Sequence, residues 1–184
     1  SNISKRTLLI MFARLINTFR REYVSRDTKF ALNGISMLIN PWHIYRRTIH
    51  NALIRDISIY TSKDVLDVGC GCKPYEAMFY SASRYVGIDV EQTGHDHSNS
   101  KVDYYFDGHN IPFEDDSFDI IVMFEVLEHV PDITQTISEI RRVLKPNGQV
   151  VITMPFIWPE HEIPYDFNRL TSIQFRRVFE EQKF

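Results

Sequence analysis

The chain has 184 residues, of which 43% are hydrophobic and 24% are charged. These values are typical of a globular protein and exclude a wholly disordered or fibrous chain, and the length suits one domain with a sizeable core. The formal net charge of -3 is unevenly distributed, because residues 1–63 carry 11 Lys or Arg against 3 Asp or Glu, and residues 64–184 carry 10 against 21. The basic leading segment can dock on the acidic body of its own domain or meet an anionic surface. Because no aromatic-basic recognition motif accompanies the charge, we expect no nucleic-acid partner.

The two cysteines, Cys70 and Cys72, are too close for a disulfide and too few for a structural zinc site. We expect them to be small buried residues in a reducing compartment, and we assign no metal to the chain. No apolar run approaches the roughly 20 residues that cross a bilayer, and the start lacks a signal-peptide cleavage site. The sequence therefore predicts a cytoplasmic protein.

The leading segment is expected to be helical. Apolar residues recur at three- and four-residue steps over residues 4–21, which predicts an amphipathic helix. That helix can cover its own domain, contact a partner subunit in a homo-oligomer, or lie on a membrane surface. A second helix is expected over residues 42–60. We therefore expect residues 1–62 to be a basic helical segment that packs on or extends a core formed by residues 63–184.

From residue 63 onward, predicted strands alternate with predicted helices. This alternation implies a parallel α/β sheet, and the continuous apolar runs fit strands buried on both faces. A basic turn followed by Pro, Asn and Gly at residues 145–148 is expected to end the helix predicted over residues 133–144. The next strand is expected to begin directly after these residues. The predicted strands cover residues 65–68, 85–89, 120–124 and 149–154, and the helices cover residues 75–81 and 133–144.

A glycine loop follows the first predicted strand. Gly69 and Gly71 allow the backbone to turn sharply and pass close to a nucleotide-like ligand. Asp89 closes the second strand, where a carboxylate can accept hydrogen bonds from both hydroxyls of a ribose. Nicotinamide dehydrogenases share these two features, so at this point they predict only an adenosine-type ligand.

Further motifs follow in order along the chain. VLDVGCG and YVGIDV are followed by FDGHNIPFEDDSFDIIVMFEVLEHV and RVLKPNGQVVITMP. Together they resemble the class I S-adenosylmethionine-dependent methyltransferases from about residue 65 to residue 184, and the later motifs have no counterpart in dehydrogenases. The segment PYDFNRLT resembles a methyltransferase type 11-like subgroup with the pattern Pro-x-Asp-Phe-x-Arg-x-Thr. The resemblance implies a Rossmann-like, doubly wound, mostly parallel sheet with S-adenosylmethionine as cofactor.

The resemblance also implies which residues contact this cofactor. The first motif would surround the methionine part and the ribose, Asp89 would hold the ribose hydroxyls, and Asp107 would accept from the adenine amino group. Lys73 stands where the family often has a third glycine. We expect its side chain to point outward, and the alternative is that it meets the carboxylate of the cofactor. The implied cofactor residues are Asp67, Gly69, Cys70, Gly71, Asp89, Val90, Asp107, Gly108, His109, Glu125 and Val126.

Candidate acceptor residues follow the fourth and fifth predicted strands. Methyl transfer mainly requires alignment of donor and acceptor, although a hydroxyl acceptor usually needs a general base. His129 is one candidate, and its alternative is a histidine satisfied by local backbone. His161, Asp166 and Arg169 lie in the loop after the fifth strand, where Asp166 and Arg169 can instead form a structural pair. Thr171 is expected to cap the last helix.

The acceptor implied by the resemblance is a small molecule or a glycan, because the subgroup is often found among enzymes of surface-polysaccharide biosynthesis. The resembled fold normally adds two further strands, so the sequence predicts a sheet without them, either because the chain is truncated or because the natural protein is short. The alternative function is a cofactor-binding but catalytically silent regulatory or structural subunit.

Overall fold

The computed structural model describes residues 43–55, 60–91 and 97–184. The chain divides into two compact units, residues 1–55 and residues 56–184. In the first unit, helix α4 (His43–Arg55) lies within the helix predicted over residues 42–60. The amphipathic helix predicted over residues 4–21 lies outside the described residues.

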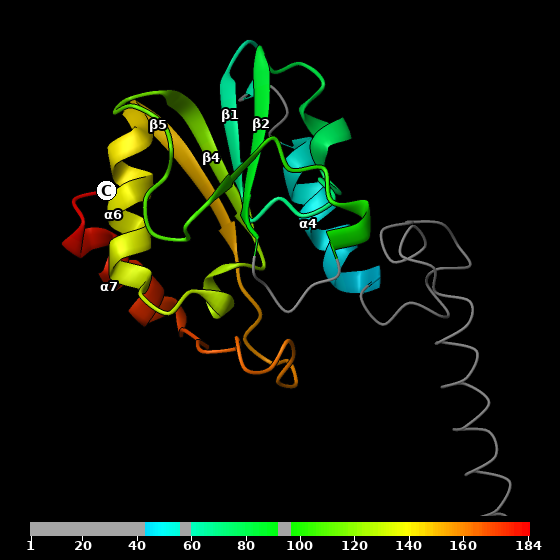
Figure 1. Cartoon of the computed structure of the whole chain (residues 1–184), viewed down its shortest axis with the longest axis vertical. Coiled ribbons are helices and arrows are strands. Elements are labelled where there is room, and N and C mark those ends of the chain that lie inside the picture. Colours follow the sequence, from blue (N-terminus) through cyan, green and yellow to red (C-terminus); the bar gives the residue numbers. More distant parts are fainter. Residues whose placement is uncertain (1–42, 56–59, 92–96) are drawn as a thin grey trace, which may run out of the picture. The chain divides into compact units, whose positions relative to one another are not determined.

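The described part of the second unit contains a parallel sheet of five strands in the order β3-β2-β1-β4-β5 (Figure 1). This confirms the expected Rossmann-like α/β sheet. The short strand β3 was not predicted, and its two tyrosines are exposed. The strands are β1 (Asp64–Val68), β2 (Arg84–Val90), β3 (Tyr104–Phe106), β4 (Phe118–Phe124) and β5 (Leu144–Thr153).

Strand β1 lies at the centre of this sheet. Its Leu66 is in register with Val86 of β2 on one side and with Ile121 of β4 on the other, both in parallel. The chain fills one side of β1 with β2 and β3, and then crosses to the other side for β4 and β5. Ligands of open α/β sheets bind at such a switch point, beyond the carboxyl ends of the strands.

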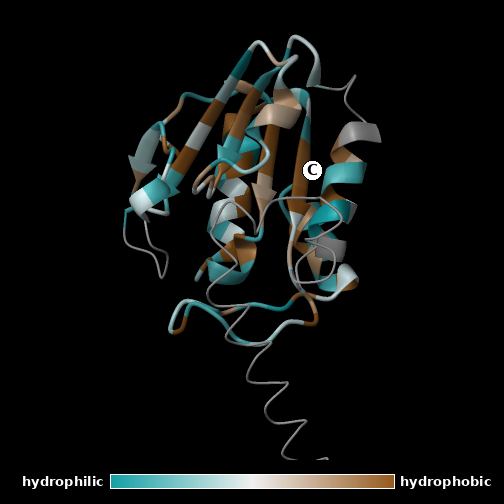
Figure 2. Ribbon diagram, turned by 90° about the vertical axis from the view of Figure 1, so that its right-hand side faces the viewer, coloured by the Kyte–Doolittle hydropathy of each residue, from teal (hydrophilic) through white to brown (hydrophobic). Residues whose placement is uncertain are grey.

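Two helices cover one face of the sheet, α6 (Ile133–Val143) and α7 (Ser172–Glu181). The wholly buried Ile137 and Ile140 of α6 pack in one cluster with Leu66 and Ile121 of the sheet. Figure 2 shows hydrophobic residues along these strands. Burial of each such side chain stabilises the fold by about 1.5–3 kcal/mol, so this face carries much of the core energy.

Aromatic rings pack beneath the other face of the sheet. The Phe79 ring lies 4.8 Å from the ring of Tyr60 and 5.1 Å from that of Tyr85, measured between centroids. The helix predicted over residues 75–81 is wrong, because only a short 3-10 helix, η1 (Glu76–Phe79), is formed. A helix of this length gains few hydrogen bonds against the cost of nucleation, so the packing of Phe79 decides the local conformation.

The start of β5 also differs from the prediction. The strand begins at Leu144, directly after α6, rather than at residue 149. Leu144 pairs with Phe118 and Gln149 pairs with Ile120, so residues 145–148 bulge out of the ladder. Asn147 has a φ of +62° in this bulge, as expected of a residue type that tolerates the left-handed region. The predicted breakers are therefore accommodated within the strand.

The last helix begins with a capping box. The Thr171 hydroxyl accepts a hydrogen bond from the Gln174 backbone at 3.3 Å, and the Gln174 side chain accepts one from the Thr171 backbone at 3.0 Å. This confirms the predicted cap at Thr171. Among the helices of the described residues, none combines the length and apolar character needed to cross a membrane.

We expect Thr171→Ala to lower the free energy of unfolding by about 1 kcal/mol, because the backbone N–H of Gln174 loses its acceptor. Urea denaturation followed by circular dichroism measures this change. Ser172→Ala is the matched control, since Ser172 is exposed and lies inside the helix. Equal stability of the two variants would contradict a stabilising role of the cap.

Candidate functional site

The loops after β1 and β2 are joined at the carboxyl edge of the sheet. The backbone N–H groups of Gly69 and Cys70 both donate to the Ile88 carbonyl, at 2.8 and 3.1 Å. One oxygen of the Asp89 carboxylate accepts from the Gly71 backbone N–H at 2.8 Å, and the other accepts from the Val90 backbone N–H at 2.8 Å. The structure therefore brings the glycine loop and Asp89 together, as one shared ligand would require.

The glycines of this region serve different purposes. Gly69 has a φ of +73°, and a Cβ there would lie 2.4 Å from a methyl carbon of Val126, so the loop after β4 packs directly on the loop after β1. Gly71 has a φ of +50°, and no atom of the described residues lies within 4 Å of the position that a Cβ would take. The backbone at Gly71 is thus open to a ligand, whereas Gly69 is closed by Val126.

Lys73 does not point outward, so that prediction is wrong. Its side chain is only 5% exposed, and its ammonium lies 2.5 Å from the Asp103 carboxylate. A Cβ at Gly87 would lie 2.5 Å from Lys73 Cε, so glycine at that position leaves room for the lysine stem. Asp103 also accepts from the Gly87 backbone N–H at 2.7 Å. Lys73 therefore anchors the glycine loop through an ion pair between its buried ammonium and the exposed Asp103 carboxylate, a contact that only the fold could reveal.

Asp67 is a buried carboxyl group below the glycine loop. It is 2% exposed, and the Tyr85 hydroxyl donates to it at 2.5 Å. Burial raises the pKa of Asp67 to about 7, although the Tyr85 hydrogen bond acts in the opposite direction. A cationic amino group beside it, such as that of a methionine moiety, would favour the ionised carboxylate.

Cys70 is buried as expected, whereas Cys72 is only partly buried, and both are free thiols. Burial raises the pKa of the Cys70 thiol well above its ordinary value. Cys70 therefore remains a neutral thiol within the glycine loop, where its sulfur lies close to the Gly87 backbone.

The loop after β3 is organised by an exposed carboxylate. Asp107 accepts hydrogen bonds from the backbone N–H groups of Asn110 at 2.7 Å and His109 at 2.8 Å. Bonds from the Asn110 backbone and side chain, followed by that of His109, lower the pKa of Asp107 to about 2. Gly108 has a φ of +80°, and a Cβ there would lie 3.3 Å from Val90. The loop thus adjoins the end of β2, and the bond from adenine to Asp107 stays a prediction.

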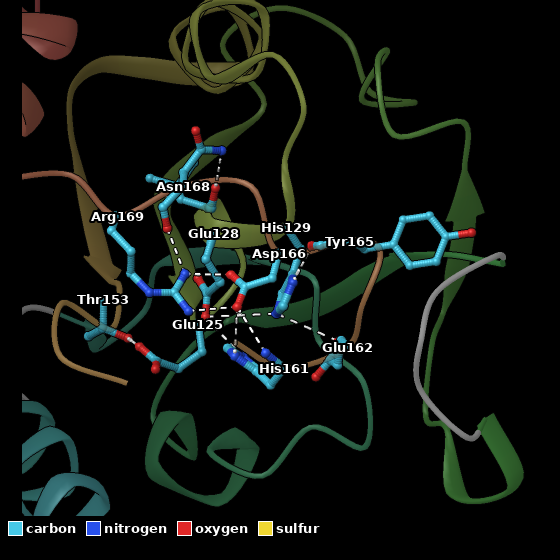
Figure 3. A network of polar contacts seen from close by, with 11 residues as sticks. Glu125, Glu128, His129, Thr153, His161, Glu162, Tyr165, Asp166, Asn168 and Arg169 are labelled. Carbon is cyan, nitrogen blue, oxygen red and sulfur yellow. Dashed lines mark hydrogen bonds and ion pairs between the residues drawn. The ribbon is translucent and has the colours of Figure 1, made fainter. Parts of the chain in front are cut away.

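The ends of β4 and β5 are tied together by Glu125 and Thr153 (Figure 3). The Thr153 hydroxyl donates to the Glu125 carboxylate at 2.9 Å, and the Glu125 backbone N–H donates to the Thr153 carbonyl at 3.1 Å. Glu125 has a φ of +57°, which turns the chain out of β4. The two loops that hold the candidate acceptor residues therefore meet at one place.

His129 and His161 lie next to each other, although 32 positions separate them in the sequence. Their rings meet edge to face with centroids 4.9 Å apart (Figure 3). His129 belongs to the short 3-10 helix η3 (Leu127–His129), and its Nδ1 lies 2.6 Å from the Tyr165 carbonyl oxygen. Because a carbonyl only accepts, Nδ1 carries the hydrogen, and a neutral ring keeps its lone pair on Nε2. One partner of the His129 ring is thus the carbonyl of Tyr165, which lies 36 positions away in the loop after β5.

Asp166 and Arg169 form a two-pronged ion pair with distances of 2.5 and 2.7 Å. The Arg169 guanidinium holds the pKa of Asp166 well below its usual range. Asp166 also accepts from the His161 backbone N–H at 3.0 Å, and its side chain is 3% exposed. This geometry supports the structural alternative for the pair, which orients His161.

The sequence analysis did not select Glu128 or Glu162 as site residues. Glu128 is wholly buried, and burial raises the pKa of its carboxyl group to about 8. Its Oε1 lies 3.9 Å from His129 Nε2 and 4.0 Å from His161 Nε2, and Glu162 Oε2 lies 3.6 Å from His129 Nε2. The available signal was that acidic residues adjoin both histidines, in EVLEHV and in EHE.

Known proteins share the sequence and fold of this region. Residues 66–152 match the family described as methyltransferase domain. The chain is 29% identical over 135 residues to demethylmenaquinone methyltransferase of Staphylococcus haemolyticus. This match covers 62% of this chain and 55% of that protein. It is 30% identical over 118 residues to a protein of Mycolicibacterium smegmatis named "Probable S-adenosylmethionine-dependent methyltransferase", covering 61% of this chain and 42% of that protein. The chain spans about half the length of these relatives.

The fold is also similar to a solved structure, the complex between the Haloferax volcanii Trm112 methyltransferase activator and a methyltransferase. The TM-score is 0.58 at 22% identity, and the match covers 72% of this chain and 65% of that chain. At this identity the similarity concerns the fold, and it agrees with the strand order found here.

We expect Asp67→Asn to change how stability depends on pH. The pKa of Asp67 rises from 3.8 to about 7 on folding, so the folded chain binds the proton more tightly, and the free energy of unfolding falls as pH increases across this interval. Asp67→Asn lacks this titrating group. Between pH 4 and pH 8 its free energy of unfolding should therefore fall less than that of the wild type. Urea denaturation across this pH range measures the difference.

Tyr85→Phe is the companion variant, because it removes the hydrogen bond that favours the ionised Asp67 carboxylate. Its stability should continue to fall above pH 7. Identical pH profiles for the wild type and Asp67→Asn would show that Asp67 has an ordinary pKa in the folded chain.

Proposed function

We propose that this chain, whose residues 66–152 form a class I S-adenosylmethionine-dependent methyltransferase domain, transfers a methyl group to a hydroxyl of a small-molecule or glycan acceptor. The observation that carries the proposal is the joining of Gly71 and Asp89 by a hydrogen bond at the open edge of the sheet. The two histidines beyond β4 and β5 supply the acceptor side.

The residues at the edge of β1 and β2 suit the cofactor. Gly71 leaves room beside the backbone, and the carboxylate of Asp89 is held in place by two backbone N–H groups, ready to accept from ribose hydroxyls. Asp67 can ionise beside the amino group of the methionine moiety. When bound, S-adenosylmethionine supplies a methyl group that is already activated on a sulfonium, so the chain mainly has to align the acceptor and exclude water.

The loop after β5 supports an acceptor with an apolar portion. Ile157 is 89% exposed and Ile163 is 72% exposed, and Phe156, Tyr165 and Phe167 expose further ring surface. Exposed apolar side chains around polar groups commonly mark ligand or partner surfaces. Demethylmenaquinone, named for the relative from Staphylococcus haemolyticus, is the probe acceptor we select on this basis.

His129 and His161 would accept the proton, or a hydrogen bond, from the acceptor hydroxyl. His129 directs its Nδ1 hydrogen to the Tyr165 carbonyl, which leaves Nε2 able to accept a proton or a hydrogen bond. Asp166, held by Arg169, orients His161 through the backbone N–H of His161. We therefore assign the acceptor contact to His129 and His161, and a positioning role to Asp166 and Arg169.

The test separates cofactor binding from methyl transfer. Calorimetric titration with S-adenosylhomocysteine should show one site, and Asp89→Ala should weaken it by about tenfold or more because the ribose hydroxyls lose their acceptor. A tritiated methyl donor then measures transfer to reduced demethylmenaquinone and to lipid and glycan extracts. His161→Ala should lower transfer by about 100-fold with cofactor affinity nearly unchanged.

Glu180→Ala is the control, because Glu180 is exposed on α7 and does not belong to this cluster. Binding of NADH in place of S-adenosylhomocysteine would overturn the cofactor assignment. Cofactor binding without transfer to any extract would favour the catalytically silent subunit. Unchanged transfer by His161→Ala would remove that histidine from the mechanism.

A further inference from the structure

The cluster after β4 and β5 contains a buried carboxylate that lacks a hydrogen-bond partner. Glu128 is 0% exposed, and neither of its side-chain oxygens has a hydrogen-bond partner among the described residues. Buried polar groups are normally paired, and an unpaired buried carboxylate destabilises the fold whether it is charged or forced to hold a proton. A group of opposite charge would relieve this cost.

Two imidazole nitrogen atoms lie near one oxygen of this carboxylate. Glu128 Oε1 lies 3.9 Å from His129 Nε2 and 4.0 Å from His161 Nε2, and all three atoms lie within 4.8 Å of one another. A tetrahedral ion at about 2.0–2.2 Å from its ligands spaces them by about 3.4 Å. Side-chain rotations that shorten these separations by about 0.5 to 1.4 Å would bring the three atoms onto one ion.

Each imidazole faces an oxygen atom of the kind that orients metal-bound histidines, and His129 is already hydrogen-bonded to its oxygen. The His129 Nδ1 hydrogen points to the Tyr165 carbonyl at 2.6 Å, which leaves Nε2 as the donor atom for a metal. His161 Nδ1 lies 3.2 Å from Asp166 Oδ2, outside good hydrogen-bond alignment, and Arg169 holds that carboxylate in place.

We propose that Glu128, His129 and His161 bind one divalent first-row transition-metal ion, with Zn²⁺ and Mn²⁺ as the best matches. Two imidazoles and one carboxylate suit such ions, whereas Mg²⁺ and Ca²⁺ prefer oxygen ligands. The three residues come from η3 and from the loop after β5, and Glu162 Oε2, 3.6 Å from His129 Nε2, is placed to contact the ion or its bound water.

The metal site would also narrow the class of methyl acceptor to molecules with a hydroxyl that can bind the ion. An ion held by three protein ligands keeps an open position, where it can bind an acceptor hydroxyl and lower its pKa. The two histidines would then act as ligands, and the hydroxyl proton would pass to water or to the adjacent Glu162 carboxylate. This part rests on the proposed methyl transfer, whereas the metal site itself does not.

The test uses the full chain after removal of metals by a chelator. Calorimetric titrations with ZnCl₂, MnCl₂ and MgCl₂, without methyl donor, should show one Zn²⁺ or Mn²⁺ per chain and much weaker binding of Mg²⁺. Glu128→Gln and His161→Asn should each weaken binding by about 100-fold. Glu180→Gln is the matched control, because Glu180 is exposed on α7 and should leave binding unchanged.

A second readout does not depend on variants. Pulsed electron paramagnetic resonance of the Mn²⁺-loaded wild type should detect nitrogen couplings from imidazole ligands. Thermal unfolding should also show a metal-dependent increase in Tm for the wild type and for Glu180→Gln, but not for Glu128→Gln. Failure of the wild type to bind any of these ions stoichiometrically, or wild-type affinity in both ligand variants, would overturn the proposal.

Two further outcomes distinguish this inference from the proposed function. Metal binding without S-adenosylhomocysteine binding would support the metal site and refute the methyl transfer. Binding of S-adenosylhomocysteine by a wild type that binds no metal would support the donor pocket and refute the metal site.

Discussion

Five parallel strands end at one edge of the sheet, and the strand order reverses between β1 and β4. This constraint brings together loops that are distant in the sequence. The Gly71 backbone N–H then donates to the Asp89 carboxylate, and Val126 packs on Gly69, so three loops form a single wall. The candidate donor pocket and the candidate acceptor cluster are neighbours for this reason, since both depend on how β1, β2, β4 and β5 terminate.

Both halves of the site hold carboxyl groups that the fold buries at a cost. Burial raises the pKa of Asp67 to about 7 and that of Glu128 to about 8, so each is poorly suited to its surroundings when ionised. Natural proteins keep such groups where function needs them, and they compensate with packing elsewhere. Here the apolar cluster between the sheet and α6 provides that compensation.

The fold restricts the chemical identity of the methyl donor more than that of the methyl acceptor. Class I domains of this kind share the edge that holds the cofactor, whereas function depends on side chains added around it. In this chain the candidate side chains come from η3 and from the loop after β5, which also exposes apolar residues.

Local sequence patterns were enough to predict the parallel sheet, the glycine loop, the position of Asp89 at the end of β2 and the cap at Thr171. These features depend on residues close together in the chain, through periodicity, backbone freedom and local hydrogen bonds. The roles of residues 4–21 and the contacts with adenine stay predictions. The tertiary structure alone decided that Lys73 turns inward to Asp103, and that Glu128 lies between His129 and His161. Those contacts join separate loops, and their energies depend on burial and charge pairing that no local pattern encodes.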